Sequence, residues 1–497
     1  MRNKLPKGWI SAELSDILEA FESGGRPKGG VKNIKHGIPS IGGEHLNSSG
    51  GFNFTKIKYI PENFYKTMSI GRIKKGDILI VKDGATTGKT SIVRENFPYR
   101  YAAVNEHVFI ARPFSEISNL YLFYYIFSFY GQDYVRRNFK GTAQGGINLA
   151  FAKNTFIPLP PLPEQHRIVA KIEDLFTKLD AGVEALKKIK KQIKQYRQAV
   201  LKYAFEGTLT EEWRLANAGK LEPANVLLEK IKKERKKQQG KKYKEPALPA
   251  GKQDLPESWM WTQFEDIGEV NPRLIKEEIA EDIEVTFLPM RCVEELTGKM
   301  DLSITKKLAK VIKGYTPFKD GDLLFAKITP CMENGKIAIA ENLHNGLGFG
   351  STEFHVIRLP ENFPRKFFFY YMIQEKFRKE AKRGMKGTAG QLRVPANYIK
   401  CVPIPLPPLL EQQKIVEEIE KRFSVADNIE KIVDENLKQA ERLRQSILKK
   451  AFEGKLVPQD PNDEPASVLL QKIKAEKKKL EEEKKVSKKK KGERGVQ

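Results

Sequence analysis

The chain has 497 residues, a formal net charge of +25 and three cysteines, Cys292, Cys331 and Cys401. This length predicts about three or four pieces of domain size, each able to bury its own core. The cysteines form neither a CxxC pair nor an even set, which argues against a zinc ribbon and indicates a reducing compartment. The apolar runs are too short to cross a bilayer, so we expect a cytoplasmic protein without membrane contact.

The positive charge is concentrated in two stretches. Residues 229–244 and 471–497 together supply +14 of the net charge. Lysine runs of this kind are usually solvated helix ends or tails. The charge therefore fits a polyanionic partner without identifying one.

The first 150 or so residues predict a mixed α/β domain. Short β-rich runs, such as residues 77–82 and 107–112, lie between turns rich in Gly and Asn. An aromatic stretch at residues 119–130 is expected to form a helix that packs its rings into the core. A KGTA turn at Lys140 precedes a proline-rich hinge, PLPPLPEQ, at residues 158–165. Because a residue before proline avoids the α region, this hinge is predicted to be extended and to end the domain.

The helix expected after the hinge has a seven-residue period. One apolar series consists of Ile172, Leu179, Leu186, Ile193 and Val200. The second consists of Ile168, Leu175, Ile189, Tyr196 and Tyr203, with Gly182 as its weak member. Two such series, spaced alternately by four and three residues, predict a coiled-coil seam. Some 40 helical residues make a rod on the order of 60 Å.

The second half of the chain repeats this order of elements. The matching segments are LPKGW at Leu5 with LPESW at Leu255, KGTA at Lys140 and Lys386, the hinges at Pro158 and Pro405, and AFEG at Ala204 and Ala451. Such self-similarity predicts two copies of one unit, and because the sequences between these segments diverge, the two copies need not read identical sites.

The second long helix has a more polar seam than the first. Its predicted apolar seam residues are Ile415, Ile419, Ile429, Val433, Leu443 and Ile447. Arg422, Asn436 and Lys450 fall at seam positions as well. Each helix would otherwise expose an apolar stripe, so the natural partner of one is the other. The alternative is that each helix lies on its own domain.

The sequence argues against catalysis. A base-flipping amino-methyltransferase needs an aromatic-bearing Asn/Asp-Pro-Pro loop, but the Pro-Pro pairs, Pro160–Pro161 and Pro407–Pro408, lie between leucines in the hinges. DGATTGKT resembles a phosphate loop, yet Asp83 stands where that loop needs glycine, and its carboxylate would repel phosphates. We therefore expect no bound cofactor. The histidines lack metal-ligand spacing, so no metal site is expected either.

Two loops in each half are candidates for DNA contact. They cover residues 82–89 and 140–148 in the first half and 327–336 and 386–393 in the second. Lys and Thr can bind phosphates or base edges, and Asn, Gln and Arg can contact bases through two hydrogen bonds. Further contacts are expected where the halves differ, around Ile38 and Phe287. The alternative is that these polar side chains only satisfy local backbone groups.

The candidate DNA-binding residues are assigned by half. In the first half they are Ser40, Glu44, His45, Lys82, Thr86, Thr87, Lys89, Lys140, Thr142, Gln144 and Asn148. In the second half they are Arg291, Lys327, Thr329, Asn334, Lys336, Lys386, Thr388, Gln391 and Arg393. The KGTA turn, being common to both halves, is expected to position the DNA, since shared residues cannot distinguish different half-sites.

The twice-repeated order of globular region, KGTA turn, PLPPLxEQ hinge, long helix and FEG ending resembles the specificity subunit of type I restriction-modification systems. The resemblance covers nearly the whole chain and implies an α+β fold with two mixed α/β target recognition domains, residues 1–160 and 255–407. Residues 161–210 and 408–456 would form an antiparallel coiled coil with pseudo-two-fold symmetry. Residues 211–254 would form a distal helix and basic linker, and 457–497 a distal helix and basic tail.

The resemblance also implies a function. Each recognition domain would read one half of a bipartite, asymmetric site in double-stranded DNA, and the coiled coil would set the spacing. Two modification subunits, which carry S-adenosylmethionine, would dock on the helices, and restriction subunits would bring ATP and magnesium. The helix residues assigned to partner binding are Ile172, Leu179, Leu186, Ile193, Val200, Ile419, Ile429, Val433, Leu443 and Ile447. The chain itself would be non-catalytic.

Two other functions remain open. One is a non-catalytic, two-headed coiled-coil adaptor that binds proteins instead of DNA. The Lys, Thr, Asn and Gln of the loops favour DNA only weakly over this alternative. The other is an antirestriction mimic of DNA, which would need an acidic surface, whereas the net charge of this chain is positive.

Overall fold

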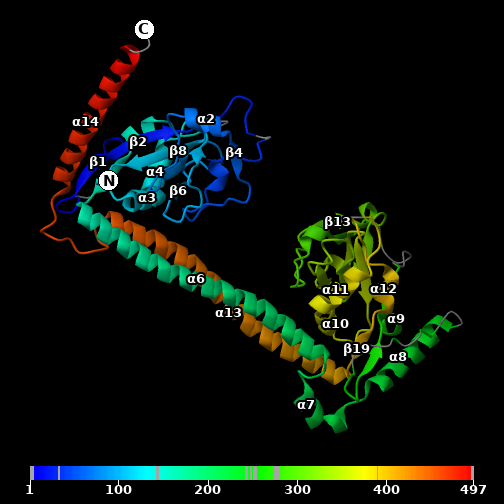
Figure 1. Ribbon diagram of the computed structural model, residues 1–497. Coiled ribbons are helices and arrows are strands. Elements are labelled where there is room, and N and C mark those ends of the chain that lie inside the picture. The colour runs from blue at the N-terminus through cyan, green and yellow to red at the C-terminus, as the bar shows by residue number, and fades with distance from the viewer. Residues whose placement is uncertain are drawn as a thin grey trace. The chain divides into compact units, whose positions relative to one another are not determined.

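The computed structural model describes residues 5–31, 34–141, 145–240, 245–246, 249, 254–273, 280, 282–388 and 390–493. The chain forms two compact units, shown in Figure 1. The first unit comprises Met1–Leu186 and Glu435–Gln497, and the second comprises Lys187–Asp434. Each contains one globular head and parts of both long helices. No helix of the described residues is long and apolar enough to cross a membrane.

The first head contains two small sheets flanked by helices. One sheet has the order β2 (Leu18–Ser23), β8 (Val108–Pro113), β5 (Ile78–Val81) and β6 (Thr90–Ile92). The other has the order β4 (Lys58–Ile60), β3 (Ile38–Ile41) and β7 (Ala103–Val104). Strand β5 is buried along its whole length, because apolar side chains cover both faces of its sheet. Helices α3 (Asn119–Phe127) and α4 (Phe129–Asn138) follow.

The second head repeats this arrangement. Its sheets are β11 (Glu269–Val270), β18 (Phe354–Arg358), β15 (Leu323–Ala326) and β16 (Ile337–Ile339), and β13 (Thr305–Lys307), β12 (Glu284–Leu288), β17 (Leu347–Gly350) and β14 (Thr316–Lys319). Helices α10 (Arg365–Ile373) and α11 (Glu375–Arg383) correspond to α3 and α4. The predicted mixed α/β heads and aromatic helices are confirmed.

Shorter helices complete the units. They are α1 (Leu14–Ile17), α2 (Glu62–Thr67), α5 (Ala150–Asn154), α7 (Glu211–Ala216), α9 (Phe264–Ile267) and α12 (Ala396–Cys401).

The Gly-Asp pair before the central strand of each head anchors a turn. Asp77 is buried and accepts two hydrogen bonds of 2.7 Å from the guanidinium of Arg112 on β8. Asp322 accepts the same two bonds, 2.8 and 2.6 Å long, from Arg358 on β18. Each aspartate also accepts the backbone N–H of the residue three positions before it. A buried carboxylate needs such partners, which explains why both copies keep this motif.

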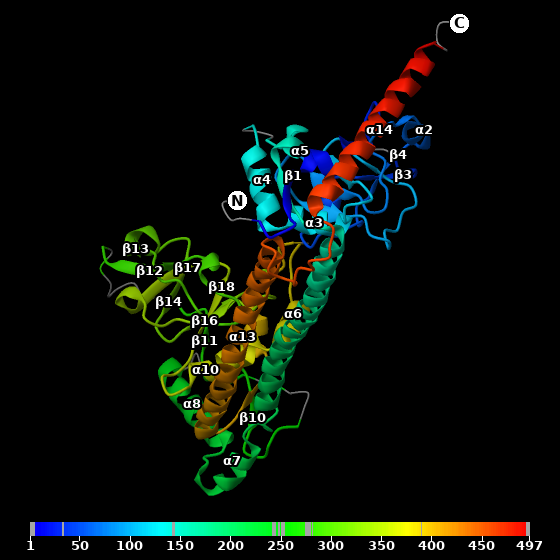
Figure 2. The ribbon, with the colours of Figure 1, turned by 90° about the vertical axis from the view of Figure 1, so that its left-hand side faces the viewer.

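The two long helices, α6 (Leu162–Phe205) and α13 (Leu409–Phe452), have 44 residues each. They lie side by side in Figures 1 and 2. In the second unit Lys190 pairs with Asp434 at 2.7 Å, and Arg197, seven residues later, pairs with Asp427, seven residues earlier. Residue numbers therefore rise along one helix as they fall along the other, and the expected antiparallel coiled coil is confirmed.

The seam of this coiled coil differs from the predicted one in one of its two series. Ile172, Leu179, Leu186, Ile193 and Val200 turn inward, as predicted. In the second series on α6, Ile168 is buried as predicted, but from Phe176 on the series is shifted by one residue, to Phe176, Val183, Lys190, Arg197 and Ala204, so Ile189, Tyr196 and Tyr203 lie outside. On α13, Ile419, Val433 and Ile447 are buried, but Ile429 and Leu443 are exposed, and the seam uses Ala426, Glu430, Leu437, Ala440, Arg444 and Ala451. The apolar period could not reveal this shift, because charged residues occupy seam positions and pair across it.

The repeated sequence segments meet at one place in each unit, which we call the junction. Strand β1 (Ile10–Glu13) pairs with β9 (Phe156–Leu159) in the first unit, and β10 (Met260–Thr262) pairs with β19 (Ile404–Leu406) in the second. The indole Nε1 of Trp9 donates to Glu164 at 3.0 Å, and that of Trp259 donates to Glu411 at 2.9 Å. The LPxxW segment thereby binds the PLPPLxEQ hinge.

The glutamines of the hinge complete the junction. The side-chain amide of Gln165 donates to the carbonyl oxygen of Pro160 at 3.0 Å, and Gln412 donates to Pro407 at 2.9 Å. Both glutamines are buried, so each satisfies a backbone group at the point where the extended hinge becomes a helix.

The AFEG endings of the long helices close the junctions. Helix α13 ends at the first junction, where Gly454 has a φ of +68° and a Cβ would lie 2.4 Å from Pro6. Helix α6 ends at the second junction, where Gly207 has a φ of +81° and a Cβ would lie 2.5 Å from Pro256. Only glycine fits such a turn against another chain segment. Each helix of one copy thus ends on the head of the other.

A further helix packs on each head. Helix α8 (Ala224–Gln239) belongs to the second unit, and α14 (Ala466–Glu493) belongs to the first. The N–H of Ala224 donates to Ser258 at 3.1 Å, and that of Ala466 donates to Gly8 at 3.0 Å. Both helices begin directly after a proline and bury apolar side chains of their first turns.

The two junction glutamates differ in their partners, which predicts opposite effects of the same substitution. Burial raises the pKa of Glu164, and its hydrogen bond from Trp9 offsets this only in part. Ionised Glu164 therefore lowers stability above the ordinary carboxyl pKa of 4.5, and this penalty disappears as the pH falls below that value. Glu164→Gln keeps an acceptor for Trp9, so we expect its melting temperature to exceed that of the wild type at pH 7.5 but not at pH 4.

Glu411→Gln is the matched control. Glu411 accepts additional hydrogen bonds of 2.8 Å from Arg214 and from Thr210. Among the described residues Glu411 is the only carboxylate paired with Arg214, so we expect loss of its charge to lower the free energy of unfolding by about 2 kcal/mol at pH 7.5. Calorimetry that showed the same sign for both variants would contradict this assignment.

Candidate nucleic-acid interface

Three loops of the first head meet at the end of strand β5. The N–H of Ile147, which follows the KGTA turn, donates to the carbonyl oxygen of Lys82 at 2.8 Å. The backbone N–H of Lys82 donates to the carbonyl oxygen of His107, which lies directly before β8, at 2.9 Å. We call this meeting point the three-loop site. It joins the two loops that the sequence predicts separately.

The second head has the same three-loop site. The backbone N–H of Val394 donates to the carbonyl oxygen of Lys327 at 2.9 Å. The backbone N–H of Lys327 donates to the carbonyl oxygen of Glu353, also at 2.9 Å. The backbone positions correspond one to one with those of the first head, although the side chains differ. A shared backbone frame with different side chains is suited to presenting two different sets of contacts.

The KGTA loop is a small hairpin in both heads. Lys140 and Gly146 exchange two backbone hydrogen bonds of 2.9 Å, and Lys386 and Arg393 do the same. The lysine side chains are exposed beside the hairpin, as are Thr388 and Gln391. The predicted contacts Thr142 and Gln144 lie outside the described residues.

A charged pair lies at each three-loop site, with different members in the two heads. In the first head the Nδ1 atom of His107 lies 2.7 Å from Asp83. In the second head Glu353 accepts from both Nε and Nη2 of Arg393, at 2.9 Å each. The hydrogen bond from Arg393 lowers the pKa of the Glu353 carboxyl, so this carboxyl is ionised at neutral pH.

Two of the predicted contacts in the first head, His45 and Ser40, are buried and do not fit a DNA-facing role, whereas a third, Asn148, is exposed. His45 is 1% exposed, its Nδ1 accepts from Gly42 at 2.8 Å, and its Nε2 lies 3.1 Å from the carbonyl oxygen of Lys56. Ser40 is buried in β3. Asn148 accepts the N–H of Ala150 at the start of α5. Both ring nitrogens of His45 have backbone partners within the head, so this side chain serves the fold, which is the alternative that the sequence left open.

The other predicted contacts lie on or near the surface. Glu44 is exposed and pairs with Lys58 at 2.5 Å. Thr86 and Arg291 are exposed, whereas Lys82, Lys89, Lys327 and Thr329 are half-buried. The side chains of Thr87, Asn334 and Lys336 already donate hydrogen bonds within their own heads, to Gly84, Glu295 and Met290 respectively.

The prediction missed four basic residues next to the KGTA loops. Arg136 and Arg137 lie in the last turn of α4, and Lys382 and Arg383 lie in the last turn of α11. The side chains of Arg136, Arg137 and Lys382 are 57, 71 and 55% exposed. In both halves of the sequence the basic pair precedes the lysine of KGTA by the same number of residues. This repeated spacing is the signal that could have identified the two pairs. Shared basic residues suit the phosphates, which are the same in every sequence.

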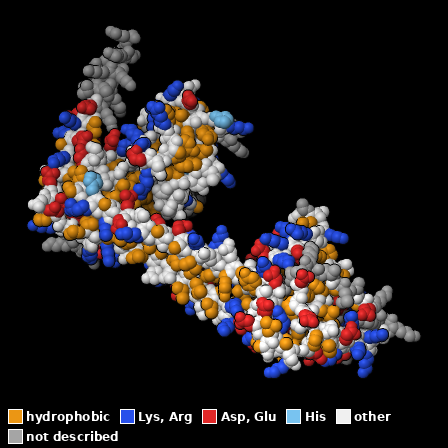
Figure 3. Space-filling model, turned by 60° about the horizontal axis from the view of Figure 1, so that its bottom comes forward, with side chains coloured by type: hydrophobic (Ala, Val, Ile, Leu, Met, Phe, Trp, Pro, Cys, Tyr) orange, Lys and Arg blue, Asp and Glu red, His pale blue; other side chains and the backbone are white. Residues whose placement is uncertain are grey.

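The second unit also exposes apolar side chains on its helix pair. On α6 these are Ile189, Tyr196 and Tyr203, with 36, 45 and 52% exposure, and on α13 they are Val425, Ile429 and Ile432, with 56, 42 and 57% exposure. We call this set the outer apolar face. Figure 3 shows hydrophobic side chains on the surface of the helices.

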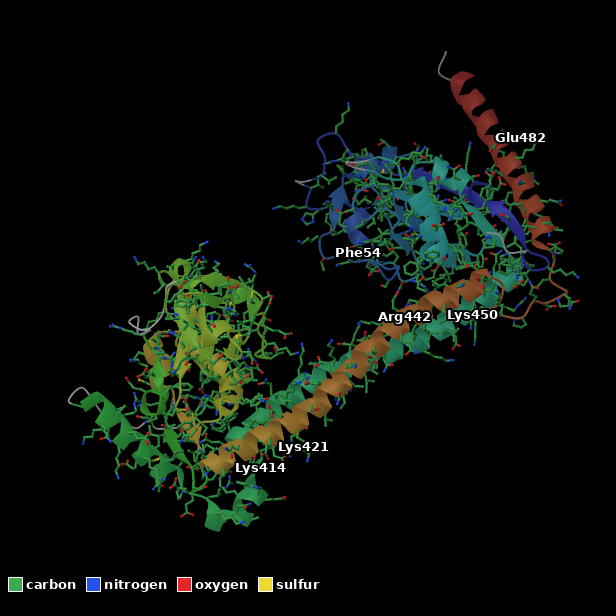
Figure 4. The ribbon with its side chains drawn as sticks, turned by 180° about the vertical axis from the view of Figure 1, so that it is seen from behind. Phe54, Lys414, Lys421, Arg442, Lys450 and Glu482 are labelled. Carbon is green, nitrogen blue, oxygen red and sulfur yellow. The ribbon has the colours of Figure 1, made fainter. Side chains whose placement is uncertain are left out.

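The outer apolar face lies away from the second head. The head packs against the opposite edge of the helix pair, where Gln198 accepts the N–H of Glu375 and the ring of Phe423 contacts Tyr370. Ile189, Tyr196 and Ile429 each precede a seam residue by one position. In an antiparallel pair the two-fold relation between the helices brings such positions to the same face. Other exposed positions of α13 carry charged side chains, such as Lys421 and Arg442, which are labelled in Figure 4.

Comparison with known proteins identifies both copies. The family described as type I restriction modification DNA specificity domain matches residues 6–195 and 256–439. The EcoAI specificity subunit of the Escherichia coli type I restriction enzyme is 35% identical over 349 residues, which span 60% of this chain and 58% of that protein. The EcoKI specificity subunit of Escherichia coli strain K12 is 27% identical over 491 residues, 95% of this chain and 96% of that protein.

Solved structures show the same fold. The HsdS subunit from Thermoanaerobacter tengcongensis aligns with a TM-score of 0.52 at 18% identity, over 91% of this chain and 99% of that one. A chain from a study of complex assembly in the type I R-M system aligns with a TM-score of 0.61 at 18% identity, over 91% of this chain and 100% of that one.

Proposed function

Because the chain belongs to the family of type I restriction modification DNA specificity domains, we propose that it is the DNA sequence-recognition subunit of a type I restriction-modification enzyme. The three-loop site carries this proposal, because the same backbone frame occurs in both heads with different side chains on it. Each head reads one half of a bipartite site. The half-sites differ, since His107 stands in one head where Glu353 stands in the other, and Asp83 where Ile328 stands.

Contacts divide between the phosphates and the bases. The basic residues that precede KGTA, together with Lys140 and Lys386, are common to both heads and bind phosphates. Base preference comes from residues that the heads do not share, such as Glu44 in the first head and Arg291 and Gln391 in the second. This division follows the general pattern in which phosphate contacts position a protein and base contacts specify the sequence.

The chain recognises DNA but does not act on it chemically. Its sequence lacks the loops of an amino-methyltransferase, and Asp83 interrupts the resemblance to a phosphate loop. Modification subunits supply S-adenosylmethionine and methyl transfer, and restriction subunits supply ATP-dependent cleavage. Two modification subunits dock per chain, because the internal repeat offers two similar surfaces.

The outer apolar face is the proposed docking surface for a modification subunit. Large apolar side chains that are about half exposed on a helix pair are costly unless a partner covers them. The face also points away from the second head, so a subunit could dock there without blocking the three-loop site of that unit.

Acidic substitutions on this face test the docking assignment. Tyr196→Asp combined with Ile432→Asp should remove one of the two modification subunits, because a buried aspartate without a partner destabilises an interface. Native mass spectrometry of the purified complex measures the ratio. The control is Lys191→Asp combined with Lys431→Asp, which changes the charge more but lies at the opposite edge of the helix pair. Two subunits retained in the first variant would contradict the assignment.

A heptad insertion tests whether the helices set the spacing between half-sites. Seven residues inserted after Leu186 and after Asp434 keep the seam in phase and lengthen the pair by about 10 Å, or at most about three base pairs. Methylome sequencing of a host that carries the system should show a longer spacer between unchanged half-sites. Insertion of four residues is the control, because it rotates the seam and should abolish methylation. A spacer unaffected by the heptad would exclude a measuring role for the helices.

A further inference from the structure

The ion pair of Arg393 and Glu353 holds an arginine in a defined orientation at the three-loop site of the second head. Nε of Arg393 donates to both carboxylate oxygens of Glu353, at 3.1 and 2.9 Å, and Nη2 donates to one of them at 2.9 Å. Nη1 donates to the carbonyl oxygen of Gln391 at 3.1 Å. The guanidinium is therefore fixed along one edge by a carboxylate and at one nitrogen by the backbone.

The remaining donors of this guanidinium match a specific acceptor. Arginine has five N–H groups, and the hydrogen bonds within the described residues leave one on Nη1 and one on Nη2. Two adjacent N–H groups of arginine pair with O6 and N7 of guanine, which lie side by side in the major groove. The side chain is 40% exposed, so DNA can reach these donors.

Hydrogen bonds also hold the backbone around Arg393 in place. Arg393 exchanges two hydrogen bonds of 2.9 Å with Lys386, and the N–H of the next residue, Val394, donates to Lys327. The backbone N–H of Lys327 donates to the carbonyl oxygen of Glu353, so both members of the ion pair belong to one frame of backbone hydrogen bonds. An arginine oriented before binding loses less conformational entropy when it contacts a base.

We propose that Arg393 reads a guanine in the second half-site and that Glu353 is the positioning residue that orients its guanidinium. The inference rests on the proposed function, because it names a base contact made by the second head. In the first head the corresponding backbone position, which exchanges hydrogen bonds with Lys140, is Gly146. A glycine carries no side chain, so the first head cannot make this contact and reads its half-site through other residues.

The test measures base preference in the complete complex of this chain with its modification subunits. Mobility shifts are recorded with duplexes that carry each base substitution in the second half-site. Arg393→Lys keeps the charge but loses the two-pronged contact, so discrimination at one G·C pair should fall by about 5- to 150-fold. Glu353→Gln should weaken discrimination at the same pair, and preferences elsewhere should remain. A purely structural ion pair would alter stability and leave the base preferences intact.

Lys386→Ala is the matched control. It removes a positive charge from the same hairpin and should weaken binding to all duplexes alike. The proposal is overturned if Arg393→Lys keeps every base preference of the wild type, or if the second half-site contains no G·C pair. Wild-type complex that bound all duplexes equally would instead contradict the proposed function itself.

Discussion

A buried hydrogen bond from a tryptophan to a glutamate holds each unit together. The hydrogen bonds from Trp9 to Glu164 and from Trp259 to Glu411 connect the first strand of each head to the hinge, at the point where a long helix starts. The glycine that ends the opposite helix packs on the same Leu-Pro segment. A change at this point would affect a strand pair, a helix start and a helix end together. This explains why the two copies keep these few segments alike while their loops have diverged.

The coiled coil follows a second constraint, which concerns charge. Lys190 and Arg197 occupy seam positions and pair with acidic residues of the other helix. Polar seam residues weaken a coiled coil but fix its register and direction. Because charged groups take seam positions, apolar side chains next to them, such as Tyr196 and Ile429, remain outside. The same arrangement thus fixes the antiparallel pairing and leaves an apolar surface for a partner.

Much of this architecture could be predicted from the sequence, because repeats, heptads and turn motifs are local patterns. The two heads, the aromatic helices and the first seam series were predicted correctly. In the second series Ile168 is buried as predicted, but the positions from Ile189 on are off by one residue, since the apolar period alone could not show that Lys190 and Arg197 point inward. The loops of the three-loop site were predicted, but their meeting was not, because it depends on long-range backbone hydrogen bonds. His45 shows a different limit, because the sequence could not tell a side chain that faces DNA from one that is buried and bonded to nearby backbone groups.

Exchange of one head tests most directly whether the two heads read DNA independently. Residues 18–154 of the first head would be replaced by the corresponding segment of another family member, leaving the strands and side chains of the first junction in place. Methylome sequencing of a host that carries the hybrid system would then give its recognition site. The account predicts that one half-site changes while the other half-site and the spacer stay the same. A change in both half-sites would show that the heads do not read separately.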